Sequence, residues 1–159
     1  MPSSHRRTAS PKSSQRATAR PRRVDQPGIA VETPMRCVVL IVEDEAILHV
    51  LAASALEAAG YDTVSASTVA EAIAIIENLE QKLDLLFTDL GLGDQTDGGL
   101  AVGQSMANSR PGFPVVYTTG RGVTDGTAKL FVEPSKFIPK PYTDQQLVGA
   151  AADQLHAPA

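Results

Sequence analysis

Apolar runs and amphipathic segments alternate along residues 36–156, and this pattern predicts five strands and five helices in turn. Most of the predicted strands are short runs of aliphatic and β-branched residues without polar alternation, which is typical of strands buried on both faces. The strands are expected at 37–42, 61–66, 83–88, 114–118 and 136–138. Apolar residues spaced three and four apart predict helices at 46–59, 69–79, 100–109 and 143–155, whereas 121–134 has only a weak helical pattern.

Strands that alternate with helices favour a parallel sheet with helices on both of its faces. For five strands the common arrangement is the doubly wound, flavodoxin-like α/β fold with the strand order 2-1-3-4-5. The first and third strands are then neighbours on either side of the point where the winding reverses. Ligands of such folds bind outside the carboxyl ends of the strands at that point, so functional residues are expected there.

Composition narrows the class of protein. The chain has 159 residues, 43% of them hydrophobic, which is enough for one domain with a buried core. No apolar run approaches the roughly 20 residues of a membrane-spanning helix, so a transmembrane protein is excluded and a cytoplasmic location is expected. The single cysteine, Cys37, excludes an intrachain disulfide framework and a zinc site built from cysteines.

The net charge of −4 conceals a division of the chain into two parts. Residues 1–34 hold seven basic and two acidic residues, with many prolines and serines and few large apolar side chains. This leader is expected to be disordered, because it cannot bury enough apolar surface to offset its ordering entropy. A basic arm that binds nucleic acid is an alternative, but a run of charge is weak evidence, so nucleic acid is not expected as a partner. Residues 35–157 are expected to form one acidic domain.

Polar residues stand where each of four predicted strands ends. Two acidic residues end the first strand, one aspartate the third, threonine the fourth and lysine the fifth. Because the strands are parallel, these ends meet at one edge of the sheet, and their side chains are expected to share a site. The residues are Glu43, Asp44, Asp89, Thr118 or Thr119, and Lys140.

Three carboxylates gathered at one site repel one another and therefore require a cation. Mg²⁺ suits a site made only of oxygen ligands, and it usually keeps several water molecules beside one or two carboxylates. Asp44 and Asp89 are expected to supply two ligands and the Gly91 carbonyl a third, while Glu43 holds a water bound to the metal. The sequence therefore predicts a magnesium site.

A carboxylate beside Mg²⁺ can attack phosphorus and form an aspartyl phosphate. The Lys140 ammonium and the Thr119 hydroxyl would then neutralise phosphoryl oxygens. An aspartate-nucleophile phosphatase acting on a small phosphorylated substrate is the alternative function. Such enzymes usually carry a second aspartate two residues after the nucleophile as acid and base, and here that position is Gly91.

The chain resembles the receiver domain of two-component response regulators over residues 36–156. Four segments carry the resemblance: VVLIVEDEAIL at 38–48, DLLFTDL at 84–90, VVYTTG at 115–120 and FIPKPY at 137–142. An acidic pair, a lone aspartate, a threonine and a Lys-Pro pair occur in this order, each closing an apolar strand. That combination is much more specific than an acidic pair alone.

The resemblance assigns a role to each residue of the predicted site. It implies that Asp89 is the phosphoacceptor, and that Glu43 and Asp44 form the acidic metal pocket to which Gly91 lends its carbonyl. It also favours Thr119 over the preceding threonine as the switch hydroxyl, because the family places this threonine before a small residue.

The resemblance further implies that Lys140 contacts the phosphoryl group and that Phe137 is the rotating aromatic residue of the switch. A histidine kinase or a histidine phosphotransfer protein would donate the phosphoryl group, and the domain would catalyse only its own phosphorylation and dephosphorylation. A downstream protein would dock on the fourth helix, fifth strand and fifth helix, unless the domain is a phosphate sink. No output domain follows Ala159, so a stand-alone receiver is expected.

Overall fold

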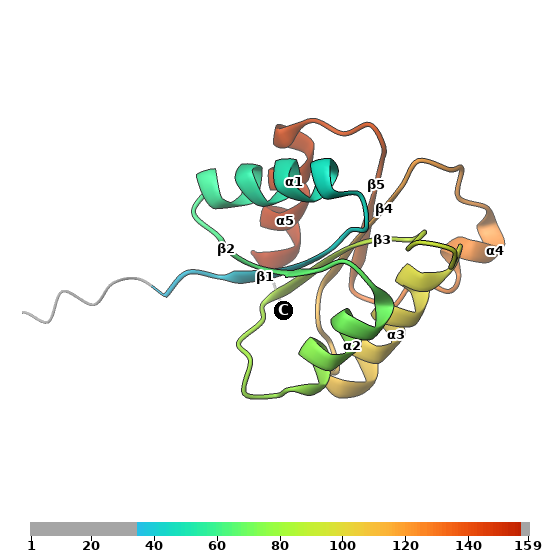
Figure 1. The fold of residues 1–159 in the computed structure, drawn as a ribbon, viewed down its shortest axis with the longest axis horizontal. Helices are drawn as coiled ribbons and strands as arrows, with labels where there is room; N and C mark the ends of the chain where they lie inside the picture. The colour runs from blue at the N-terminus through green and yellow to red at the C-terminus, as the bar shows by residue number, and fades with distance from the viewer. Residues whose placement is uncertain (1–34, 157–159) are drawn as a thin grey trace, which may run out of the picture. The chain divides into compact units, whose positions relative to one another are not determined.

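The sheet is parallel and five-stranded, with the order β2-β1-β3-β4-β5 (Figure 1), as the sequence predicts. The computed structural model describes residues 35–156, so the predicted disorder of 1–34 lies outside the described residues, as does the last residue of the predicted domain. The strands span β1 Val38–Val42, β2 Asp62–Ala66, β3 Leu85–Asp89, β4 Val115–Thr119 and β5 Ser135–Pro139.

Helices cover both faces of this sheet. Figure 1 shows α1 and α5 on one side and α2 and α3 on the other, which is the doubly wound arrangement. The fourth helix has only four residues, in agreement with the weak helical pattern over 121–134. None of the helices within 35–156 is long and apolar enough to cross a membrane. The helices span α1 Ala46–Ala58, α2 Val69–Glu77, α3 Gly98–Ser109, α4 Asp125–Ala128 and α5 Asp144–Leu155.

The sheet separates two hydrophobic clusters. Successive strand residues point to opposite faces, so Leu40 and Leu86 pack under α2 and α3, whereas Ile41 and Phe87 pack under α1 and α5. All four side chains are at most 1% exposed. Burial on both faces explains why these strands are continuous apolar runs in the sequence.

The outer face of α1 is a departure from the usual amphipathic pattern. The apolar residues whose spacing marks this helix in the sequence include Ile47, Val50 and Leu51, and the structure leaves them 76%, 61% and 57% exposed. The face that packs on the sheet carries Ala52 and Leu56 instead. Small alanines let α1 lie close to the strands, so this helix is apolar on both its inner and outer faces.

Thr68–Glu71 and Thr143–Gln146 have the residue spacing of a capping box, and the two boxes form to different extents. At α5 the Thr143 side chain accepts a hydrogen bond from the Gln146 amide, and the Gln146 side chain accepts one from the Thr143 amide. At α2 the Thr68 hydroxyl accepts from the Glu71 amide, but the Glu71 carboxylate accepts from Ser67 instead of Thr68. Both helices nevertheless begin where the boxes predict.

Glycine at position 99 holds α3 against the end of β3. Its amide donates a 2.8 Å hydrogen bond to the Leu90 carbonyl, and a Cβ atom at this position would lie only 2.1 Å from the Asp89 carbonyl oxygen. No side chain fits there without a shift of the backbone. This close approach therefore helps to position Asp89 at the edge of the sheet.

Tyr117 occupies the interior beneath α3. It is fully buried, and a Cβ atom at Gly103 would lie 2.1 Å from its hydroxyl oxygen. The hydroxyl accepts a 3.3 Å hydrogen bond from the Val132 amide, and the ring stacks on Phe131 at 4.4 Å between centroids. Phe131 in turn faces Phe137 at 6.2 Å, so one aromatic stack joins β4, the segment before β5 and β5 itself.

Candidate functional site

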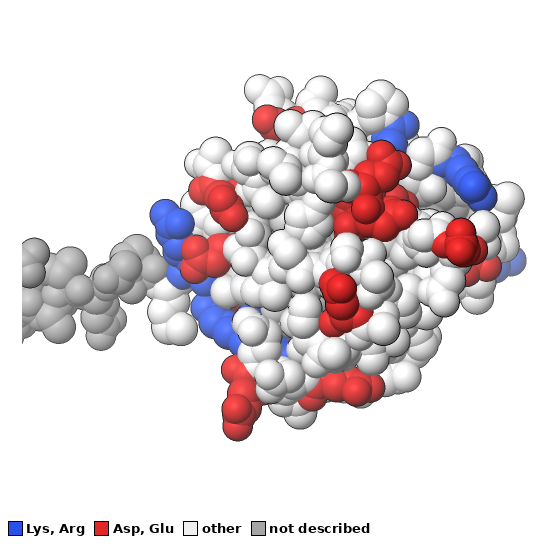
Figure 2. Space-filling view, viewed as in Figure 1, with Lys and Arg blue, Asp and Glu red and all other residues white. Residues whose placement is uncertain are grey.

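The carboxyl ends of four strands bring the predicted polar residues together. Strand register places Asp89 beside Thr118 and Thr119 beside Pro139, so Asp89 and Lys140 are separated by a single strand. The turn after β1 carries Glu43 and Asp44 to the same edge. Figure 2 shows a group of acidic side chains on the right of the molecule, over the carboxyl ends of the strands, with basic side chains nearby.

Lys140 joins the two most buried carboxylates of the site. Its Nζ lies 2.6 Å from Asp89 Oδ2 and 3.0 Å from Glu43 Oε2. Its backbone amide donates to the Thr119 carbonyl, which fixes the start of the lysine side chain relative to β4. A single ammonium group therefore partly neutralises the carboxylates, and it lies directly beside the predicted phosphoacceptor.

Glu43 is only 1% exposed. Burial raises the pKa of its carboxyl group, since an anion is disfavoured where water is excluded. The hydrogen bonds from Lys140 and from the Glu45 amide act against that rise in pKa. Loss of either partner would therefore raise the pKa of Glu43 further.

For Lys140, the two carboxylate partners together have a larger effect on the pKa than burial has. Burial by itself would lower the pKa of the ammonium group, but the hydrogen bonds to Asp89 and Glu43 outweigh it, so the pKa is raised. The side chain is therefore positively charged across the physiological range. A fixed positive charge beside a carboxylate is suited to neutralising an incoming anionic group.

The loop after β3 folds back over Asp44. The Gly93 amide donates a 2.9 Å hydrogen bond to Asp44 Oδ2, and the Gly91 amide donates a 3.2 Å hydrogen bond to Asp89 Oδ1. An isolated bridge between Leu92 and Gln95 closes the loop. Gly91 lines the site as expected, and the role of its carbonyl as a metal ligand stays a prediction.

Glu43, Asp44 and Asp89 suit a divalent cation. One carboxylate oxygen from each lies within 4.8 Å of the others, and Asp44 is exposed to solvent while the other two are buried. The three candidate ligands are all carboxylate oxygens, the type of ligand that Mg²⁺ prefers. The mouth beside them is a cavity of about 290 Å³, whose walls include Asp89, Thr119 and Lys140.

The structure distinguishes the two threonines at the end of β4. Thr119 lines the mouth, and its hydroxyl accepts a 3.2 Å hydrogen bond from the Arg121 amide. Thr118 lies on the opposite face of the strand, and within residues 35–156 its buried Oγ1 has no hydrogen-bond partner. Phe137 is half-buried in the aromatic stack and is not among the residues of the mouth.

Three further residues belong to this region although the sequence analysis gave them no role. Arg121 lines the mouth. Its position two residues after Thr119 could have indicated from the sequence that it lies at the site. Tyr142 follows Lys140 by two residues and packs edge-on against Phe87. His49 has Nδ1 3.3 Å from the Glu43 carbonyl and Nε2 2.6 Å from Ser65 Oγ. That contact joins α1 to β2, and no spacing in the sequence indicates it.

Comparison with known families decides the classification. The profile described as the response regulator receiver domain matches residues 39–152, which is most of the chain. The chain belongs to the response regulator receiver family. This receiver is also similar in structure to a response regulator receiver protein from Sinorhizobium medicae, with a TM-score of 0.70 and 30% identity over 77% of this chain and 96% of that one.

Curated relatives of the receiver include whole regulators and a kinase. The phosphate regulon transcriptional regulatory protein PhoB of Pseudomonas aeruginosa is 32% identical over 111 residues, which is 69% of this chain and 48% of that protein. The sensor kinase CckA of Brucella abortus is 27% identical over 119 residues, only 12% of its length. The chain thus spans about half or less of the length of these relatives.

Several of the relatives are named as transcriptional regulators. The expectation that nucleic acid is not a partner therefore finds no support in the comparisons.

Proposed function

We propose that this receiver accepts a phosphoryl group on Asp89 from the phosphohistidine of a histidine kinase or a histidine phosphotransfer protein, in the cytoplasm and with Mg²⁺ as cofactor. The observation that carries the proposal is the contact of Lys140 with Asp89 at the floor of an open, acidic mouth. A nucleophilic carboxylate, a fixed cation and a place for a divalent metal meet there. Family membership favours the same function.

The side chains divide the work of phosphoryl transfer. A carboxylate oxygen of Asp89 forms the bond to phosphorus while the bond from phosphorus to the donor nitrogen breaks, and the electron pair of that bond stays on the nitrogen. The Lys140 ammonium and the Thr119 hydroxyl are placed to neutralise phosphoryl oxygens. Glu43, Asp44, Asp89 and the Gly91 carbonyl would hold Mg²⁺, which supplies further charge neutralisation when bound.

The phosphatase alternative has less support. It needs an acid and base near the leaving group, and the position two residues after Asp89 is Gly91. The buried cation–carboxylate arrangement around Lys140 is suited to holding a phosphoryl group on the protein. Catalysis is therefore proposed to be limited to the receiver's own phosphorylation and dephosphorylation.

Incubation with acetyl phosphate and Mg²⁺ tests the proposed function. Intact-mass measurement is expected to show the gain of one phosphoryl group, labile to hydroxylamine as an acyl phosphate is. Chelation of divalent metal before the donor is added is expected to prevent the gain. A phosphoryl group that survives hydroxylamine, or release of phosphate from many small phosphate esters without a labelled protein, would contradict the proposal and favour the phosphatase.

A switch from the site to the partner surface is the second part of the proposal. Thr119 lies in the mouth, and Tyr117, two residues earlier on the same face of β4, is in the stack with Phe131 and Phe137. A shift of the Thr119 hydroxyl toward a phosphoryl group would make room for Phe137 to turn inward. The surface of α4, β5 and α5 would then change shape for a downstream partner.

Hydrogen exchange measures whether this switch operates. Addition of beryllofluoride, which mimics a phosphoryl group, together with Mg²⁺ is expected to slow exchange most in 119–134 and around Phe137. The Thr119→Ala variant is expected to lose this slowing while it keeps Mg²⁺ binding. If exchange slows only around 43–45 and 89–99, the receiver binds phosphate without a conformational response and is a phosphate sink.

A further inference from the structure

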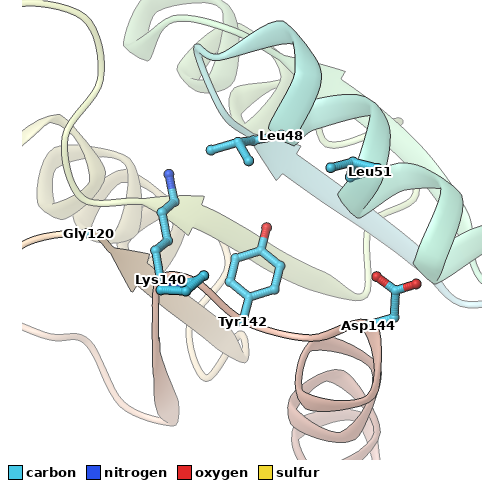
Figure 3. A pocket seen from close by; sticks show the side chains of 7 residues that line it. Leu48, Leu51, Gly120, Lys140, Tyr142 and Asp144 are labelled. Atoms are coloured by element: carbon cyan, nitrogen blue, oxygen red, sulfur yellow. The ribbon is translucent and has the colours of Figure 1, made fainter.

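A second cavity, of about 540 Å³, lies beside the acidic mouth (Figure 3). Leu48 and Leu51 of α1 form one wall, and Pro141 and Tyr142 of the segment after β5 form the other. Figure 3 shows the tyrosine hydroxyl pointing toward α1, with Asp144 at the far side. The cavity is thus largely apolar, in contrast to the mouth, and phosphoryl transfer as described above makes no use of it.

The two cavities adjoin at Lys140. Both Lys140 and Gly120 line the mouth and also line the apolar cavity. The ammonium nitrogen of Lys140 lies 2.6 Å from Asp89 Oδ2, so one side chain both contacts the reacting carboxylate and lines the apolar cavity. A group attached directly to a phosphoryl group in the mouth therefore has an apolar surface beside it.

We propose that the apolar cavity binds the leaving group of small aromatic acyl phosphates, so that this receiver takes a phosphoryl group from such donors in preference to acetyl phosphate. The inference rests on Asp89 being the phosphoacceptor. An aromatic ring matches the aliphatic and tyrosine walls, and the carboxylate that departs is next to the Lys140 ammonium. The position of the cavity next to the mouth and this match of charge favour a small donor over an unrelated apolar ligand.

The chemistry balances without another reactant. An oxygen of the Asp89 carboxylate forms the bond to phosphorus, and the bond from phosphorus to the acyl oxygen breaks. The electron pair of that bond leaves with the aromatic carboxylate, so no proton is transferred and nothing is oxidised or reduced. The products are phosphoaspartate and an aromatic carboxylate anion.

Tyr142 can assist this departure. Its ring is held edge-on against Phe87 at 5.8 Å between centroids, so the side chain has a defined position. Burial and the nearby Glu43 raise the pKa of its phenol to about 12, and the hydroxyl is therefore protonated at neutral pH. It is available to donate a hydrogen bond to an oxygen of the leaving carboxylate.

The test compares the rates of phosphorylation by benzoyl phosphate and by acetyl phosphate in the full chain. Leu51→Gln replaces part of the apolar wall at a residue that is 57% exposed, so the fold is expected to persist. The ratio of the benzoyl to the acetyl rate is expected to fall at least threefold in this variant. Free benzoate is expected to inhibit labelling of the wild type by benzoyl phosphate more strongly than labelling by acetyl phosphate.

Val50→Gln is the matched control, because Val50 lies on the same helix, is 61% exposed and does not line this cavity. Its rate ratio is expected to equal that of the wild type. If Leu51→Gln has the same rate ratio as the wild type, the inference is overturned. It is also overturned if the variant is phosphorylated more slowly only when the donor is a phosphorylated histidine phosphotransfer protein. The cavity would then bind a side chain of that partner protein. Absence of labelling by both donors would instead refute Asp89 phosphorylation itself.

Discussion

The Asp89→Asn variant is expected to take up no phosphoryl group while remaining folded. An amide is not a nucleophile toward phosphorus, so the loss is expected to be complete. Asparagine has nearly the same shape as aspartate, and its oxygen can still accept the 3.2 Å hydrogen bond from the Gly91 amide. Lys140 keeps its second carboxylate partner, Glu43, at 3.0 Å. The fold is therefore expected to survive the substitution.

Intact-mass measurement after incubation with acetyl phosphate and Mg²⁺ gives the result, and circular dichroism checks that the variant is folded. Asp94→Asn is the control, since Asp94 is an exposed acidic residue of the loop that follows Asp89. Its labelling is expected to equal that of the wild type. If Asp89→Asn is labelled as strongly as the wild type, another residue is the phosphoacceptor and the proposed function loses its basis.

Replacement of Lys140 by methionine is expected to lower both phosphorylation and stability. The rate of labelling should fall about a hundredfold, because a preorganised positive charge beside the transferred group is lost. The free energy of unfolding at pH 7 should fall by about 3 kcal/mol, because buried carboxylates are left without their cation. Urea denaturation and the labelling rate measure the two effects separately.

The pH dependence of the loss of stability in Lys140→Met identifies the cause of that loss. Lys140 holds down the pKa of Glu43, so the pKa rises further above its ordinary value of 4.5 when the lysine is removed. Between the ordinary pKa and the raised one, Glu43 is protonated in the folded variant but not in the unfolded chain. The folded variant therefore becomes more stable as the pH falls through this range. The stability difference between variant and wild type is therefore expected to narrow as the pH falls from 7 toward 4.5. A difference that is independent of pH would indicate lost packing only.

Lys136→Met is the control for these measurements. Lys136 lies on β5, four residues before Lys140, and pairs with an aspartate, Asp153, but the two side chains are 41% and 63% exposed. An exposed pair contributes roughly 1 kcal/mol or less, and a change in stability within that limit is expected. The contrast between the two lysines separates the effect of burial from the effect of losing a lysine.

The sequence predicted the strands and the meeting of the polar residues at one edge of the sheet, because both follow from local rules. A strand buried on both faces has to be apolar throughout, and a parallel sheet places all its carboxyl ends at one edge. Glu43, Asp89 and Lys140 were therefore assigned to one site from their positions alone, whereas Thr119 was chosen over its neighbour by the resemblance to the receiver family. The structure brings them together as expected.

Other features depend on contacts between distant segments, and the local pattern carries little sign of them. The apolar spacing of α1 correctly indicated a helix, but the buried face consists of alanines and Leu56, while Leu51 faces outward. The contact of His49 with Ser65 and the hydrogen bond from Gly93 to Asp44 require knowledge of which loops meet. The same is true of the apolar cavity, whose two walls are about ninety residues apart in the chain.

The packing of Gly103 against Tyr117 has a consequence for how this sequence can change. The two positions share a single volume, because a Cβ atom at 103 would lie 2.1 Å from the tyrosine hydroxyl. Alanine at 103 becomes admissible once position 117 has lost its hydroxyl group, because the nearest ring atoms would then lie 3.0 and 3.2 Å away, and that loss would also remove the acceptor of the Val132 amide. A larger residue at 103 therefore requires a change at 117, and each residue restricts the mutations that the other can tolerate.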